Sequence, residues 1–161
     1  MNDQLFNSTF EMKIRFLLLL NVSKRPETLD WLICMDFISC YAEEFQLPYI
    51  SLHGTNQYMY GEMPRRRIIA QEAVKAMVKE ALAQVTVERG YYYKISSSGK
   101  RYVKKLSSSY SYEYTEIAKE ALQRFKGAED IELMKIIQDK ALTGVKEGDA
   151  YVLHKENKHI N

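Results

Sequence analysis

Side chains that commonly carry catalysis are scarce in this sequence. It has three histidines (His53, His154 and His159) and two cysteines (Cys34 and Cys40). The cysteines fall on different faces of a predicted helix, so we expect reduced thiols and no disulfide between them. No His, Cys, Asp and Glu residues have metal-ligand spacing, and no glycine-rich loop could cradle a phosphate. We therefore predict no catalytic, cofactor or metal site and no enzyme activity, and we interpret His53 as a turn or packing residue.

Positive charge gathers in two segments, although the net charge of the chain is only +2. Neighbouring lysines and arginines could neutralise the phosphates of a nucleic acid, or dock on an acidic protein surface. They could also simply solvate helix faces. The residues of this predicted binding surface are Arg65, Arg66, Arg67, Lys75 and Lys79 in one predicted helix, and Arg89, Lys94, Lys100, Arg101, Lys104 and Lys105 after it.

A long irregular segment, residues 46–64, is rich in aromatic side chains. Loops of this length are uncommon in compact domains and are usually functional or specifically packed. Buried aromatic side chains are also the usual anchors of protein interfaces. We predict that its apolar residues pack on their own domain or form part of a protein interface, and these residues are Tyr49, Leu52, Tyr58 and Tyr60.

One acid, Asp36, falls near the apolar side of a predicted helix, between Met35 and Phe37. A buried carboxylate requires a partner of opposite charge. We expect Asp36 to be ion-paired with Arg15 or with an arginine of the segment 65–67, at a structural joint.

These residues must be positioned by a mainly helical chain. Ser8 and Glu11 form a capping box that predicts a first helix, which ends near Lys24-Arg25-Pro26. Apolar residues at helical spacing predict two further helices, over residues 28–45 and 65–84.

The period then changes from helical to alternating over residues 85–96, which predicts a β-hairpin with its turn at Gly90. Steps of three and four residues next predict one long helix from residue 97 or 98 to Phe125. A last helix, residues 129–142, should stop at Gly144 and be followed by a polar tail.

This order is typical of a winged helix-turn-helix. We predict a mainly α (α+β) winged helix-turn-helix with a β-hairpin wing (residues 1–126) and a C-terminal helical extension with a polar tail (residues 127–161). In that fold the two basic segments would merge into one positive surface. The expected core residues include Leu17, Leu18, Leu32, Ile33, Val74 and Val78.

The longest apolar run, residues 16–20, is far shorter than the roughly 20 residues that span a bilayer. It also lacks the flanking features of a signal peptide. We therefore expect no membrane contact and a cytoplasmic location.

Several short motifs resemble one group of bacterial proteins. The chain is similar to the middle components of three-component ABC-ATPase systems and to the small subunits of Lamassu-type anti-phage and anti-plasmid defence. The resemblance covers residues 5 to about 126. Its motifs are Leu5-Phe6-Asn7-Ser8-Thr9-Phe10-Glu11, Arg15, Leu29-Asp30, Met35-Asp36-Phe37-Ile38, Tyr41, Leu52-His53-Gly54, Asn56, Tyr58 and Arg65-Arg66.

The resemblance implies a non-catalytic accessory or bridging subunit. Its partners would be a coiled-coil ABC ATPase of the structural-maintenance-of-chromosomes (SMC) kind, which senses foreign DNA, and an effector, often a nuclease. DNA would be a further ligand. The alternative function is a free-standing winged-helix DNA-binding transcription regulator, which would dimerise to recognise a palindrome.

Overall fold

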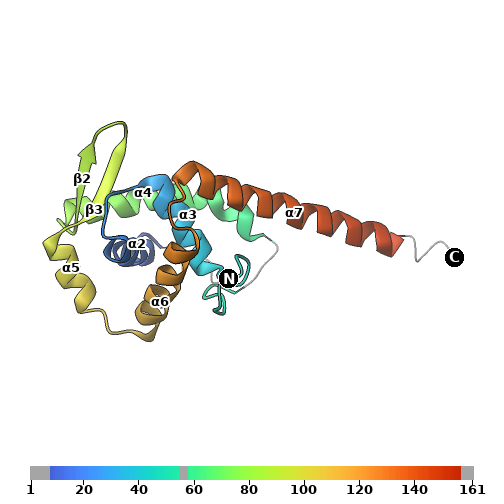
Figure 1. Cartoon of the computed structure of the whole chain (residues 1–161), viewed down its shortest axis with the longest axis horizontal. Coiled ribbons are helices and arrows are strands. Elements are labelled where there is room, and N and C mark those ends of the chain that lie inside the picture. The colour runs from blue at the N-terminus through green and yellow to red at the C-terminus, as the bar shows by residue number, and fades with distance from the viewer. Residues whose placement is uncertain (1–7, 55–57, 157–161) are drawn as a thin grey trace.

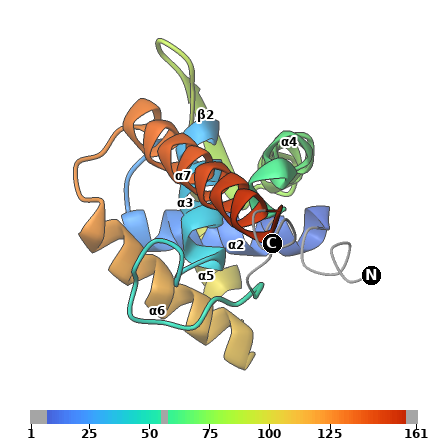
Figure 2. The same ribbon diagram turned by 90° about the vertical axis from the view of Figure 1, so that its right-hand side faces the viewer.

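Helix α2 (Thr9–Ser23) runs through the centre of the body of the molecule, where helices from four other segments and the sheet pack around it (Figures 1 and 2). The computed structural model describes residues 8–54 and 58–156, with side chains as far as residue 143. Ser8 caps α2 as expected, because its Oγ accepts the Glu11 N–H at 3.1 Å. The apolar run from Phe16 to Leu20 is fully buried, so α2 forms the middle of the core.

Three long helices cover α2: α3 (Leu29–Cys40), α4 (Met63–Lys79) and α6 (Ser109–Arg124). The N-cap of α3 is Thr28, whose Oγ1 accepts the Trp31 N–H at 3.1 Å. Between α3 and α4, the irregular segment includes a short 3-10 helix, η1 (Met59–Glu62). α4 ends five residues before the predicted end of the third helix, since the chain turns at Ala81 (φ 59°) into a strand.

The sheet has three antiparallel strands, in the order β1-β3-β2. Strands β2 (Ala83–Val87) and β3 (Tyr91–Ile95) form the predicted hairpin, with Gly90 at φ 153° in its turn. Strand β1 (Glu27–Thr28) was not predicted, because two residues before a helix carry no alternating pattern. It lies against Tyr92 and Tyr93 of β3 and so joins the hairpin to the start of α3.

The predicted single helix from residue 97 to Phe125 is wrong. The structure has α5 (Ser97–Lys104) and α6, separated at residues 105–108. Ser108 begins the second helix, since its Oγ accepts the Ser111 N–H at 3.1 Å. Serine side chains compete for backbone hydrogen bonds and favour caps over helix interiors, so a run of serines outweighed the apolar periodicity.

The last helix, α7 (Asp130–Glu156), also differs from the prediction, because it continues through Gly144. A glycine inside a helix costs only about 1 kcal/mol relative to alanine and does not by itself end one. Leu133 and Ile137 are buried where the first part of α7 packs on α3. Beyond them the helix projects away from the body (Figure 1).

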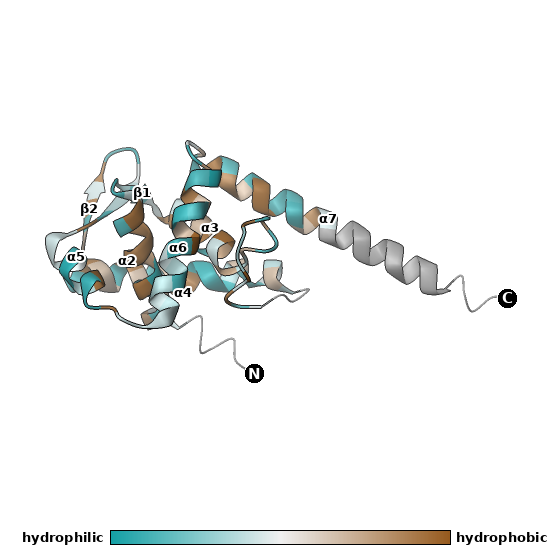
Figure 3. Ribbon diagram, turned by 60° about the horizontal axis from the view of Figure 1, so that its bottom comes forward, coloured by the Kyte–Doolittle hydropathy of each residue, from teal (hydrophilic) through white to brown (hydrophobic). Residues whose placement is uncertain are grey.

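Apolar residues are concentrated in α2 and α3, whereas the outer helices are mixed in character (Figure 3). Among the described residues, no helix has both the length and the apolar character needed to cross a membrane. Five of the six predicted core residues are buried: Leu17, Leu18, Leu32, Ile33 and Val74. The sixth, Val78, is only half-buried, because it lies in the last turn of α4.

The difference between Leu32 and Val78 gives a stability test. Leu32 is fully buried, so Leu32→Ala should leave a cavity and lower the free energy of unfolding by about 2–5 kcal/mol. Val78→Ala should cost less than about 1.5 kcal/mol, because the site is already partly hydrated. Urea denaturation of both variants measures the two values. Equal losses would contradict the burial of Leu32 in α3.

Candidate functional site

A buried ionic network joins four helices at the side chain of Asp36. Arg15 Nε on α2 donates to Asp36 Oδ1 at 2.7 Å, and its Nη2 donates to Oδ2 at 3.1 Å. Arg66 Nη1 on α4 donates to Oδ2 at 2.8 Å. Tyr114 on α6 donates its hydroxyl hydrogen to Oδ1 at 2.7 Å. The predicted ion pair of Asp36 is therefore confirmed, with both proposed partners present.

The network keeps Asp36 ionised inside the protein. Burial alone would raise the pKa of this carboxyl group, but the charges of Arg15 and Arg66 outweigh it and hold the pKa at about 2. Arg66 also lies over the rings of Phe37 and Tyr41, at 5.3 and 5.6 Å from their centroids. These groups fix the relative positions of the helices, so the role of Asp36 is structural.

The sequence had placed Arg66 in an exposed surface that binds nucleic acid or an acidic protein, but the structure buries this residue. Its side chain is 1% exposed, and the ion pair with Asp36 holds it in the core. Arg67 is half-exposed and forms an ion pair with Asp30 of α3. Of these three neighbouring arginines, Arg65 alone is exposed.

The other basic residues form two exposed groups on the described surface. We call Arg65, Lys75 and Lys79 the α4 cluster, and Lys100, Arg101, Lys104 and Lys105 the α5 cluster. Gly99 is the point at which α5 approaches the body closely, because a Cβ atom there would collide with the Leu82 carbonyl oxygen. The basic side chains of α5 lie away from this contact and face solvent.

The two clusters do not merge into the single surface that was expected. α4 and α5 pack on different sides of α2 (Figure 2). Arg89 and Lys94 are exposed on the hairpin. The charge predicted from the sequence is thus distributed over separate faces of the molecule.

The aromatic segment between α3 and α4 divides into inner and outer residues. Tyr60 is half-buried and donates its hydroxyl hydrogen to Glu44 Oε1 at 2.7 Å. Leu52 is half-buried against the core. Tyr49 and Tyr58 are 37% and 73% exposed. The inner pair packs on its own domain, and the outer pair is accessible to a partner.

His53 is a packing residue, as predicted. Its ring stacks on that of Tyr110, with centroids 6.5 Å apart, and its Nε2 lies 3.1 Å from the Tyr110 hydroxyl oxygen. Burial, followed by the charges of Arg15 and Arg66, lowers the pKa of His53 to about 3. An imidazole with this pKa stays neutral near pH 7 and is poorly suited to exchange protons there.

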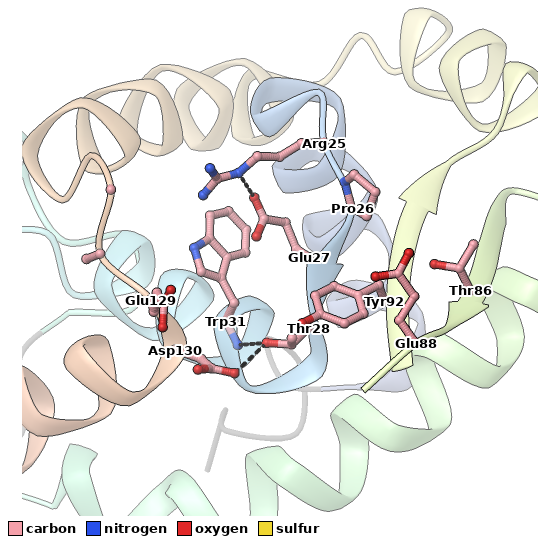
Figure 4. A pocket seen from close by; sticks show the side chains of 12 residues that line it. Arg25, Pro26, Glu27, Thr28, Trp31, Thr86, Glu88, Tyr92, Glu129 and Asp130 are labelled. Atoms are coloured by element: carbon pink, nitrogen blue, oxygen red, sulfur yellow. Dashed lines mark hydrogen bonds and ion pairs between the residues drawn. The ribbon is translucent and has the colours of Figure 1, made fainter. Parts of the chain in front are cut away.

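A cleft of about 510 Å³ opens where the hairpin, the start of α3 and the connection to α7 meet (Figure 4). Arg25 Nε donates to Glu27 Oε1 at 2.7 Å, and Thr28 Oγ1 donates to Asp130 Oδ2 at 2.9 Å. Burial raises the pKa of Glu27, opposed by Arg25. The cleft combines two aromatic side chains with an excess of acids: Trp31, Tyr92, Glu27, Glu88, Glu129 and Asp130.

Sequence reasoning missed this cleft. Its acids come from three segments separated by about 40 to 60 residues, and none of those segments has a local motif. The pairing of β1 with β3, which brings these segments together, was itself not predicted.

Neither cysteine resembles a reactive thiol. Cys34 and Cys40 are both buried and free, and burial raises their pKa values to about 12 and 11. Within the described ranges, no three His, Cys, Asp or Glu side chains gather as metal ligands would. His154, His159, the polar tail and the motif residues Leu5, Phe6, Asn7 and Asn56 lie outside the described side chains.

Residues 5–147 match a family model described as "ABC-three component (ABC-3C) system Middle Component 2". The match extends beyond residue 126, where the resemblance of the short motifs ended, and includes the first part of α7. Neither a curated protein nor a solved structure matches the chain.

The buried network predicts opposite results for neighbouring arginines. Arg66→Gln leaves Asp36 with only one guanidinium, and breaking a buried pair typically costs about 3–5 kcal/mol. Arg65→Gln is the matched control and should change stability by less than about 0.5 kcal/mol, since Arg65 is exposed. Urea denaturation distinguishes the two variants. A stable Arg66→Gln variant would refute a structural role for Arg66.

The environment of His53 predicts a pH dependence of stability. Its folded pKa, about 3, lies below the usual value of 6.5, so between these values the unfolded chain binds a proton that the folded chain does not. Stability should therefore fall as the pH falls from 6.5, with a slope approaching about 1.4 kcal/mol per pH unit from this group. His53→Gln should remove that part of the slope, measured by urea denaturation from pH 4.5 to 7. An unchanged slope would be inconsistent with a buried neutral His53.

Proposed function

Because this chain belongs to the Middle Component 2 family of ABC-three component systems, we propose that it is a non-catalytic bridging subunit of a bacterial defence complex. It would join a DNA-sensing, SMC-like coiled-coil ABC ATPase to an effector, often a nuclease, in Lamassu-type defence against phages and plasmids. Its buried, unreactive thiols are compatible with work in the reducing cytoplasm.

The order of the elements supports a winged-helix assignment within this proposal. Helix α2, strand β1, helices α3 and α4, and the hairpin β2–β3 follow one another as helix, strand, helix, helix and wing. We propose that residues 1–126 form this domain and that residues 127–161 form a helical extension. Leu133 and Ile137 anchor the extension on the core, while Ile131 and Leu142 of α7 are exposed and available to a partner.

The observation that carries the bridging role is the separation of the exposed surfaces. A bridging subunit contacts two unlike chains at once and therefore needs binding surfaces that face different directions. The α4 and α5 clusters lie on different sides of α2, and α7 extends away from both (Figures 1 and 2). Tyr49 and Tyr58 add exposed aromatic side chains.

The alternative, a free-standing transcription regulator, has less support. In such a protein α4 would enter the DNA groove, where arginines bind base edges and phosphates. Arg66 is instead bound to Asp36, Arg67 is paired with Asp30, and the same helix exposes Ile68 by 64%. We therefore favour the α5 cluster, rather than α4, as the contact to DNA or to an acidic protein surface.

Co-expression with the products of the neighbouring genes tests the bridging role. Affinity purification of the ATPase should recover both this chain and the effector. The control omits this chain, and the ATPase should then no longer recover the effector. Recovery of the effector without this chain would exclude bridging, as would failure of this chain to bind either protein.

Charge reversal tests the ligand of the α5 cluster. The variant Arg101→Glu, Lys104→Glu, Lys105→Glu should leave the complex assembled but lower its DNA affinity. The salt dependence should weaken too, because each phosphate contact contributes about 0.9 to the slope of log affinity against log salt concentration. The matched control is Lys75→Glu, Lys79→Glu in the α4 cluster. Loss of assembly without any effect on DNA binding would assign the α5 cluster to a protein contact.

A further inference from the structure

The outer edge of the sheet is formed by β2, and its hairpin stands clear of the helices (Figure 1). At one end of the hairpin, the Ser96 N–H donates to the Leu82 carbonyl oxygen at 3.0 Å. At the other end, the Glu88 N–H donates to the Gly90 carbonyl oxygen at 3.1 Å. Hydrogen-bonded pairs alternate along antiparallel strands, so residues 82, 84, 86 and 88 are the ones that bond to β3. The N–H and C=O groups of Val85 and Val87 therefore point away from β3, out of the free edge of the sheet.

The side chains beside this edge are apolar and exposed. Val85 is 38% exposed and Val87 is 68% exposed, although valine favours half-buried positions in sheets. Tyr91, directly opposite Val87 in the register, is 63% exposed. Because side chains alternate between faces, these three residues lie on one face of the hairpin. The free backbone groups and the apolar patch are therefore adjacent.

From Val85 to Val87, this edge also lacks the features that usually protect edge strands. Natural proteins prevent edge-to-edge pairing with lysines, prolines, bulges or covering segments. The sequence of β2 is Ala-Gln-Val-Thr-Val, with no charge and no proline. The first charged residues, Glu88 and Arg89, occur only in the turn. An unprotected edge of this kind is a template for another strand.

We propose that the edge of β2 is a docking site for an extended segment of one partner subunit of the complex, which adds to the sheet as a fourth strand. Its backbone would hydrogen-bond to Val85 and Val87, and apolar residues at every second position would cover these valines and Tyr91. This inference rests on the proposed function, since it needs a partner subunit, and it specifies how that partner is held.

A second copy of this chain fits the same edge less well. Pairing two β2 strands about their accessible residues 85–87 would bring the charged turn of each copy against the start of the other copy's β2. That start is covered, because Leu82 N–H bonds to Met77 of α4 and Ala83 is 3% exposed. An extended segment of another protein can pair with Val85 and Val87 without bringing a hairpin turn against the covered start of β2.

Three variants of the full-length chain, each co-expressed with its partners, test the proposal. Val87→Pro removes an outward N–H without removing a bond to β3, and Val87→Lys adds an edge charge while keeping the backbone. Each should lower the affinity for the partner about tenfold or more, Val87→Pro through the lost hydrogen bond and Val87→Lys through the lost apolar contact and the cost of desolvating the added charge. The control, Thr86→Lys, adds the same charge on the opposite face of the hairpin and should change affinity by less than about twofold. Unchanged melting temperatures confirm that the variants are folded.

Backbone hydrogen exchange of the wild-type chain gives a readout independent of the variants. The Thr86 amide should be protected both alone and in the complex, whereas the Val85 and Val87 amides should be protected only in the complex. If assembly occurs and these two amides stay unprotected, the docking site is wrong and the bridging role stands. If the isolated chain dimerises with concentration and protects them, a second copy is the occupant and the proposal is overturned. If the wild-type chain binds no partner, both proposals fail.

Discussion

The carboxylate of Asp36 is the group on which the arrangement of the helices depends. It is fully buried on α3 and receives hydrogen bonds from Arg15 of α2, Arg66 of α4 and Tyr114 of α6. Taking such charges out of water costs about as much as their attraction returns, so the network adds little net stability. Its effect is on specificity. A shift of α2, α3 or α4 would leave a buried charge unpaired, and that penalty disfavours alternative packings.

This constraint also decides which surfaces remain for partners. Because Arg66 is paired with Asp36 in the core, the exposed side of α4 has one positive charge fewer. Arg67 forms an ion pair with Asp30. The Asp36 network also fixes α3, against which both β1 and the first part of α7 pack. The hairpin, the acidic cleft and the projecting helix thus take their positions from the core, and the basic clusters face different directions as a result.

The features predicted correctly were those encoded by neighbouring residues. Ser8 caps the first helix as its local motif indicates, the alternation around Gly90 marks the hairpin, and Asp36 stood out as an acid on an apolar face. The errors came from competition between signals or from long-range pairing. Ser108 began a new helix where periodicity had predicted a continuous one, and Gly144 did not end the helix that it was expected to end.

Burial of single residues was the hardest property to predict. Arg65 and Arg66 are identical in type and adjacent, yet one is exposed and the other is in the core. Helical periodicity alone does not choose between them, because the choice depends on where Asp36 lies in the folded chain. The acidic cleft could not be predicted from the sequence for the same reason, since three distant segments form it.

The hairpin presents different side chains on each of its faces. Val85, Val87 and Tyr91 lie on one face, whereas Thr86, Glu88 and Tyr92 line the cleft on the other. Inserting or deleting one residue within a strand would exchange the two faces, because the side-chain period is two. Substitutions can therefore accumulate here more readily than changes of length. Over evolutionary time, this hairpin should vary in composition while its strands keep a fixed number of residues.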